Sequence, residues 1–96
     1  MKFDEYYKLY MGLHKNKWNR RLHVAGQVAT IAFVFSCLYW QHYILLLLAP
    51  FVVYPFAWSG HYFFEKNKPA AFSDPIKAKL ADWVMFKNWI LGRIER

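Results

Sequence analysis

The sequence predicts an all-α membrane protein, in which a two-span transmembrane helical hairpin is flanked by N- and C-terminal amphipathic interfacial helices. Two observations carry this prediction. The 42 residues from His23 to Phe64 contain no Lys, Arg, Asp or Glu, and a transmembrane helix needs about 20 mostly apolar residues. Both flanks are basic, with six basic and two acidic side chains in residues 1–22 and seven and four in residues 65–96. The positive-inside rule therefore places both termini on the cytoplasmic face.

Four helices are expected in a single membrane-embedded domain of residues 1–96. They cover about residues 3–13, 20–40, 43–64 and 75–92. Aromatic residues recur at helical spacing in the first, which is typical of an interfacial helix. Pro50 and Pro55 should kink the third, and Asp74 before Pro75 favours a helix start for the fourth. On its apolar face we expect Ile76, Leu80, Trp83, Val84, Ile90 and Leu91.

The composition also bounds partners and location. The cations lie next to apolar spans, so the expected partner is a bilayer with anionic headgroups and no nucleic acid. Such a chain belongs in the inner membrane of a bacterium or the endoplasmic reticulum of a eukaryote. Cys37 is the single cysteine, so it forms no intrachain disulfide and is expected to be a packed or lipid-facing thiol. Two spans enclose little volume, which is compatible with a homodimer.

The histidines form a pattern once the hairpin is folded. A turn near residue 42 pairs positions whose numbers sum to about 84, which brings His23 level with His61 at the end opposite the turn. His61 and Glu65 are four residues apart and can share a helix face. His14 lies nine residues before His23, so the two can share a site only if the helix breaks between them. His42 is expected to lie far away at the turn.

Imidazoles with a carboxylate suit a first-row transition metal. Two other interpretations remain open at this point. Histidines at equal depth on adjacent spans also suit a haem-binding electron-transfer hairpin, and a Trp- and Tyr-rich surface suits a non-catalytic membrane interaction protein. Asp82 is expected to form a surface ion pair with Lys79, with a supporting role at the site as the alternative.

The motifs His14-x4-Asn19-Arg20-x-Leu22-His23-x2-Gly26 and Gly60-His61-x3-Glu65-x3-Pro69-Ala70 resemble those of the membrane-embedded 2-hydroxy fatty acid dioxygenases. The fungal members of this family convert phytosphingosine to odd-chain fatty acids. The resemblance covers about residues 3–93. The chain is similar to a short, bacterial-type branch, because the larger fungal members have more apolar sequence between the motifs.

The resemblance implies an Fe(II)-dependent enzyme that uses O2 to remove C1 of a 2-hydroxy fatty acid. It implies that His14, His23 and His61 bind the iron, with Glu65 as a fourth ligand or as an orienting residue. Asn19 would support the site, and Gly26 and Gly60 would allow close helix approach. Weaker candidates for attracting the substrate carboxylate are Arg20, Arg21, Lys66 and Lys68.

Overall fold

The structure, a computed structural model, describes residues 2–68 and 74–94. Within these residues it contains helices and no strand, so the predicted all-α class is confirmed. Pro69 and Ala70, which end the second sequence motif, lie outside the described residues.

A short break separates the first two helices. α1 spans Phe3–Gly12 and α2 spans Lys17–Tyr39. Asn16 caps α2, because its side chain accepts a hydrogen bond from the backbone N–H of Trp18 at 2.8 Å. The break that a site shared by His14 and His23 requires is therefore present. At 1.5 Å per residue α2 is about 35 Å long, enough to cross a hydrocarbon core of about 30 Å.

The chain reverses at Gln41, which adopts the left-handed conformation with φ 59°. The N–H of His42 donates to the carbonyl of Cys37 at 2.9 Å, and the N–H of Gln41 donates to that of Leu38 at 3.3 Å. These two bonds form a Schellman motif, which satisfies the last carbonyls of a helix. The turn lies where the sequence predicted it, and Cys37 is a buried thiol beside it.

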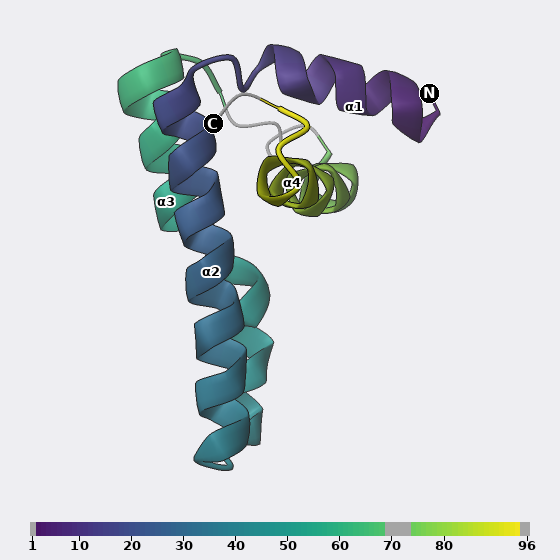
Figure 1. Cartoon of the computed structure of the whole chain (residues 1–96). Helices are drawn as coiled ribbons and strands as arrows, with labels where there is room; N and C mark the ends of the chain where they lie inside the picture. Colours follow the sequence, from purple (N-terminus) through teal and green to yellow (C-terminus); the bar gives the residue numbers. More distant parts are fainter. Residues whose placement is uncertain (1, 69–73, 95–96) are drawn as a thin grey trace.

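The returning apolar segment is irregular. It consists of the 3₁₀-helix η1 (Tyr43–Phe51), the α-helix α3 (Tyr54–Gly60) and the π-helix η2 (His61–Glu65). Pro50 lies inside η1, where its missing N–H interrupts regular bonding. Pro55 lies in the first turn of α3, where proline is well tolerated. The segment runs back along α2 (Figure 1). Both α2 and residues 43–65 are long and apolar enough to cross a membrane, judged by length and composition.

Two glycines allow α2 and α3 to approach closely. A Cβ at Gly26 would lie 2.8 Å from Cγ2 of Val53, and a Cβ at Gly60 would lie 2.0 Å from Oδ1 of Asn19. Neither position has room for a larger residue without movement of its neighbour, as the resemblance implied.

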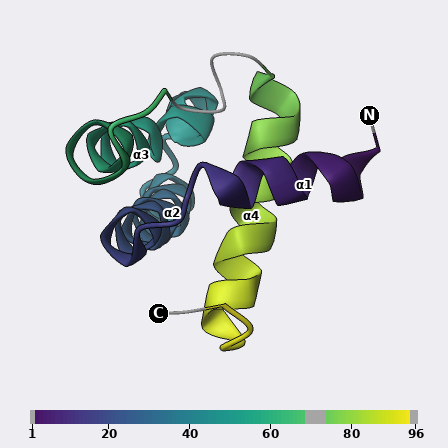
Figure 2. The same cartoon turned by 90° about the horizontal axis from the view of Figure 1, so that it is seen from above.

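The remaining helix, α4, spans Pro75–Ile90, and Asp74 caps it by accepting from the N–H of Lys77 at 3.1 Å. α1 crosses α4 beside the end of α2 that is remote from the turn (Figure 2). Tyr10, Ala78, Ala81 and Met85 form a buried cluster at the crossing, with Phe3, Tyr6, Tyr7 and Leu13 packed against it. The aromatic face of α1 thus packs on α4. Four residues of the apolar face that the sequence predicted for α4 are exposed in the structure, namely Ile76, Leu80, Ile90 and Leu91.

Candidate metal centre

Buried polar side chains gather where α2, η2, α4 and the break after α1 meet. Among the described residues they are His14, Asn19, His23, Gln27, Thr30, His61 and Asp82. Burying a polar group is unfavourable unless it finds a partner. Such a concentration in a small chain therefore indicates a functional site.

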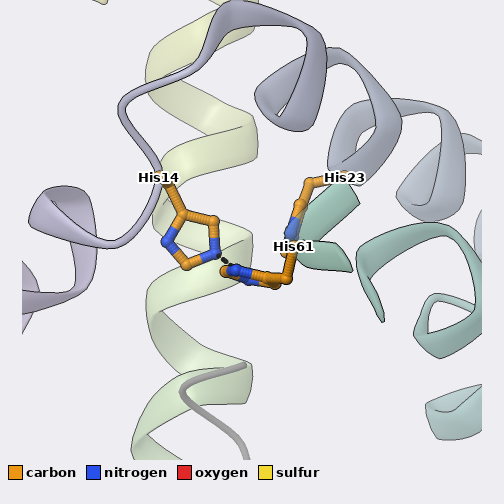
Figure 3. A group of neighbouring side chains, drawn as sticks. All are labelled: His14, His23 and His61. Atoms are coloured by element: carbon orange, nitrogen blue, oxygen red, sulfur yellow. Dashed lines mark hydrogen bonds between the residues drawn. The ribbon is translucent and has the colours of Figure 1, made fainter. Parts of the chain in front are cut away.

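Three histidines converge at the centre of this group (Figure 3). His14 comes from the break between α1 and α2, His23 from α2 and His61 from the first position of η2. Their ring centroids are 4.5 to 5.3 Å apart, and one ligating nitrogen of each lies within 4.8 Å of the other two. None is more than 3% exposed. His42 is exposed at the turn, outside this cluster.

Each imidazole is held on its outer side by a hydrogen bond that its Nδ1 makes to an oxygen atom. The partner of His14 is the carbonyl of Tyr10 at 2.7 Å, that of His23 is Oδ1 of Asp82 at 3.2 Å, and that of His61 is Oδ1 of Asn67 at 2.6 Å. All three partners are acceptors, so each Nδ1 carries the proton and donates. This is the arrangement in which protein histidines bind metals, because it fixes the ring and leaves Nε2 as the ligand.

In a neutral imidazole whose proton is on Nδ1, the inner nitrogen Nε2 carries a lone pair and no hydrogen. Nε2 of His14 and Nε2 of His61 lie 2.9 Å apart, and Nε2 of His23 is buried without a partner. Lone pairs that face one another in a dry site repel unless a cation lies between them. The donor set thus fits a metal ion that accepts imidazole nitrogen, such as zinc, copper, iron or nickel.

Burial keeps His14 in the form that can bind a metal. Loss of solvation, together with the neighbouring His23, lowers the pKa of His14 from 6.5 to about 2. The imidazole is therefore neutral across the physiological pH range, and a neutral imidazole is required for metal ligation.

Tyr10 and Asp82 hold two of the histidines in place. The interpretation of Asp82 as a member of a surface ion pair is wrong. Asp82 is only 5% exposed and accepts from His23. It also accepts a side-chain hydrogen bond from Tyr10, and burial followed by the Asp82 charge raises the pKa of the Tyr10 hydroxyl. Tyr10 additionally stacks on His14, with ring centroids 4.0 Å apart. One tyrosine thus positions His14 directly and His23 through Asp82.

Asn67 fixes the third histidine, and the sequence interpretation missed it. Its Oδ1 accepts from His61, its Nδ2 donates to the carbonyl of Leu13 at 3.1 Å, and its backbone N–H donates to the carbonyl of His61 at 3.2 Å. Lys66 makes this possible by adopting the left-handed conformation, with φ 57°. The only sequence signal was an Asn directly after the second span, among charged residues.

Glu65 lies outside the histidine cluster. Its carboxylate accepts a hydrogen bond from the backbone N–H of Asn16, at the positive N-terminus of α2. In this position it ties the end of η2 to the break that carries His14.

The other candidate residues separate into buried and peripheral ones. Asn19 is completely buried against Gly60, and neither its Oδ1 nor its Nδ2 has a partner. Nε of Arg20 donates to the carbonyl of His14 at 2.6 Å, and the Arg21 guanidinium lies 4.5 Å over the Trp18 ring. Lys66 and Lys68 are exposed and line an open hollow with Tyr62, Phe63 and Asn67.

A comparison with protein families identifies the chain. The model of the family described as 2-hydroxy-palmitic acid dioxygenase Mpo1-like matches residues 1–94. The chain belongs to this family. The match covers every described element of the fold and all three clustered histidines. Searches of curated proteins and of solved structures gave no match.

The outer hydrogen bond to His23 gives the first prediction. Asp82→Asn removes the carboxylate charge and keeps a carbonyl oxygen of the same size. The variant should bind metal about 10- to 100-fold more weakly, the usual effect of mutating such a partner. Competition with a chelator of known affinity measures this change. Asp4→Asn, an exposed carboxylate on α1, is the matched control and should bind as the wild type does. Equal affinity in both variants would contradict a positioning role for Asp82.

Proposed function

We propose that the protein is a membrane-embedded Fe(II)-dependent dioxygenase that shortens 2-hydroxy fatty acids by one carbon. The observation that carries the proposal is the convergence of three buried, outwardly hydrogen-bonded histidines in a chain of the 2-hydroxy-palmitic acid dioxygenase Mpo1-like family.

His14, His23 and His61 would hold the iron. When bound, Fe(II) supplies a redox centre with open coordination positions for O2 and the 2-hydroxy acid. The cluster contains no carboxylate among its inner groups, whereas many non-haem iron oxygenases combine two histidines with one carboxylate. A 2-hydroxy acid brings a carboxylate of its own. Two contacts position the segment that carries His14. Glu65 accepts a hydrogen bond from the N–H of Asn16, and Arg20 donates one to the carbonyl of His14.

The surroundings of the histidines keep water away from the reacting carbons. Tyr10 covers His14 on one side, and the close contact of Gly60 with Asn19 seals α2 against α3. The unpartnered Asn19 amide lies one helical turn from His23 and can hydrogen-bond a polar group of the substrate. A buried amide without a protein partner is costly, and a bound ligand or water removes that cost.

The apolar helices suit a membrane setting. Large side chains on the half nearer the turn are more than half exposed, with values of 67% for Phe35, 74% for Ile44, 69% for Leu47 and 59% for Phe51. A soluble protein rarely exposes so continuous an apolar surface. We place α2 and residues 43–65 across the bilayer as a hairpin, with α1, α4 and both termini at the cytoplasmic face.

The haem alternative fits the geometry less well. An axially ligated haem needs a flat gap between two imidazoles. The ring centroid of His14 lies 4.6 Å from that of His23 and 4.5 Å from that of His61. The His14 imidazole therefore occupies the space beside the His23–His61 pair. An intense Soret band in the purified protein would favour haem, because a non-haem Fe(II) site is nearly colourless.

Product analysis tests the proposed reaction. Anaerobically purified protein in lipid nanodiscs is loaded with Fe(II) and given O2 and 2-hydroxypalmitate. We expect the C15 fatty acid, with one O2 consumed per product, since R–CH(OH)–COOH and O2 balance with R–COOH, CO2 and H2O. Palmitate without the hydroxyl is the matched control and should remain unchanged. Full iron occupancy without a C15 acid would refute this reaction.

A further inference from the structure

A groove opens beside the histidine cluster, between α2, η1 and α4. Its lining consists of Gln27, Thr30, Ala49, Pro50, Lys79 and Trp83, and its volume is about 270 Å³. Ligand pockets in proteins start at about 300 Å³. The groove therefore suits the reactive end and first carbons of a lipid, with the rest of the chain among apolar side chains and lipid.

Helix geometry places the groove next to the metal centre. Gln27 follows His23 by four residues, one turn or about 6 Å further along α2 toward the apolar half. On the opposite wall, Lys79 and Trp83 flank Asp82, the hydrogen-bond partner of His23. The His23–Asp82 pair is therefore close in sequence to lining residues on both walls of the groove.

The groove holds a polar group without a protein partner. Gln27 is 1% exposed and its Nε2 is buried with no hydrogen bond. By contrast, the Thr30 hydroxyl donates to the carbonyl of Gly26 at 2.9 Å, so its hydrogen is used within α2. An amide donor left unsatisfied at the wall of a groove indicates an acceptor that comes from a ligand.

A cation lies on the facing wall. The half-buried Lys79 ammonium donates to the carbonyl of Pro50 and lies 4.5 Å over the Tyr54 ring. An ammonium group has three N–H donors, so Lys79 can also attract an anion at the groove. Ala49, Pro50 and Trp83 offer no charge along the remaining wall.

We propose that this groove binds the 2-hydroxy fatty acid, with Gln27 donating to an oxygen of its polar end, Lys79 attracting its carboxylate and the alkyl chain following Ala49, Pro50 and Trp83. The proposal rests on the proposed function for the identity of the ligand. It adds a binding site and a residue, Gln27, that binds the polar end of the ligand.

Photo-crosslinking tests the site without relying on turnover. The probe is a 2-hydroxy fatty acid with a diazirine in its alkyl chain, added anaerobically to the iron-loaded protein in nanodiscs. We expect labels on the peptides that contain Ala49, Pro50 and Trp83, and we expect excess 2-hydroxypalmitate to prevent them. Labels confined to other surfaces, in a protein that forms the C15 acid, would overturn the groove and leave the reaction intact.

Two substitutions sharpen the test. Gln27→Leu should weaken binding of 2-hydroxypalmitate about tenfold or more, as for a lost hydrogen bond to a charged group, with full iron content and unchanged stability. Ala49→Phe should fill the groove and prevent labelling. Leu47→Phe is its matched control, because Leu47 lies on the same helix and is 69% exposed. Equal binding in the wild type and all three variants would overturn the proposal.

The two proposals fail in different ways. Groove labelling that 2-hydroxypalmitate prevents, without a C15 acid from fully loaded protein, would support the groove and refute the reaction. A C15 acid from Ala49→Phe at the wild-type rate would support the reaction and overturn the groove.

Discussion

Protein carrying His61→Ala should be purified without iron. The substitution removes one of the three inner nitrogens and leaves His14 and His23 as an incomplete pair. The loss of affinity should exceed the 10- to 100-fold effect of removing an outer hydrogen-bond partner, and formation of the C15 acid should stop. Metal analysis of anaerobically purified protein measures the occupancy, and circular dichroism checks that the helices remain.

His42→Ala is the matched control for this experiment. His42 is exposed at the turn, and it is not part of the histidine cluster. The same substitution there should leave iron content and product formation unchanged. Full iron occupancy in His61→Ala, or equal losses in both variants, would contradict the proposed ligand set.

Gly60→Ala should disrupt the site through the backbone alone. The added Cβ would lie 2.0 Å from Oδ1, 3.0 Å from Cγ and 3.3 Å from Cα of Asn19, so the conflict reaches the backbone of α2. Overpacking of this kind destabilises a protein by about 1–3 kcal/mol. Because Gly60 directly precedes His61, the shift should also separate His61 from His23. We expect a lower unfolding temperature and at least tenfold weaker metal binding.

Gly12→Ala tests whether this effect is specific to the helix contact. A Cβ at Gly12 would meet nothing within 4 Å, and alanine in a helix is favoured over glycine. The control should match or slightly exceed the wild type in stability and bind metal normally. If Gly60→Ala behaved in the same way, the close approach of α2 and α3 would not position the site.

The sequence was sufficient to predict the helical class, the turn and the meeting of the histidines. An uncharged apolar stretch with a polar and aromatic turn at its middle leaves few ways to fold, and the resulting register places His23 beside His61. Helix geometry required a break between His14 and His23 if the two were to share a site, and the structure contains that break, with Asn16 capping the helix that follows.

Asn67 was not predicted as the partner of His61, and a supporting role for Asp82 was expected only as an alternative, because such contacts depend on tertiary packing. Asp82 reaches His23 across 59 positions of sequence, and the packing of α4 against α2 sets that distance. Within the second apolar segment, residues 61–65 form a π-helix, whose wider turn changes the angle between residues four apart. The assumption of regular α-helix aimed Glu65 at the cluster, whereas the structure places it at Asn16.

Iron K-edge X-ray absorption of the Fe(II)-loaded protein in nanodiscs tests the three-histidine site most directly. We expect light-atom ligands, with the outer-shell scattering of three imidazole rings in the wild type and of only two in any partially loaded His14→Ala or His23→Ala variant. A porphyrin pattern, or a spectrum with one imidazole or none, would contradict it.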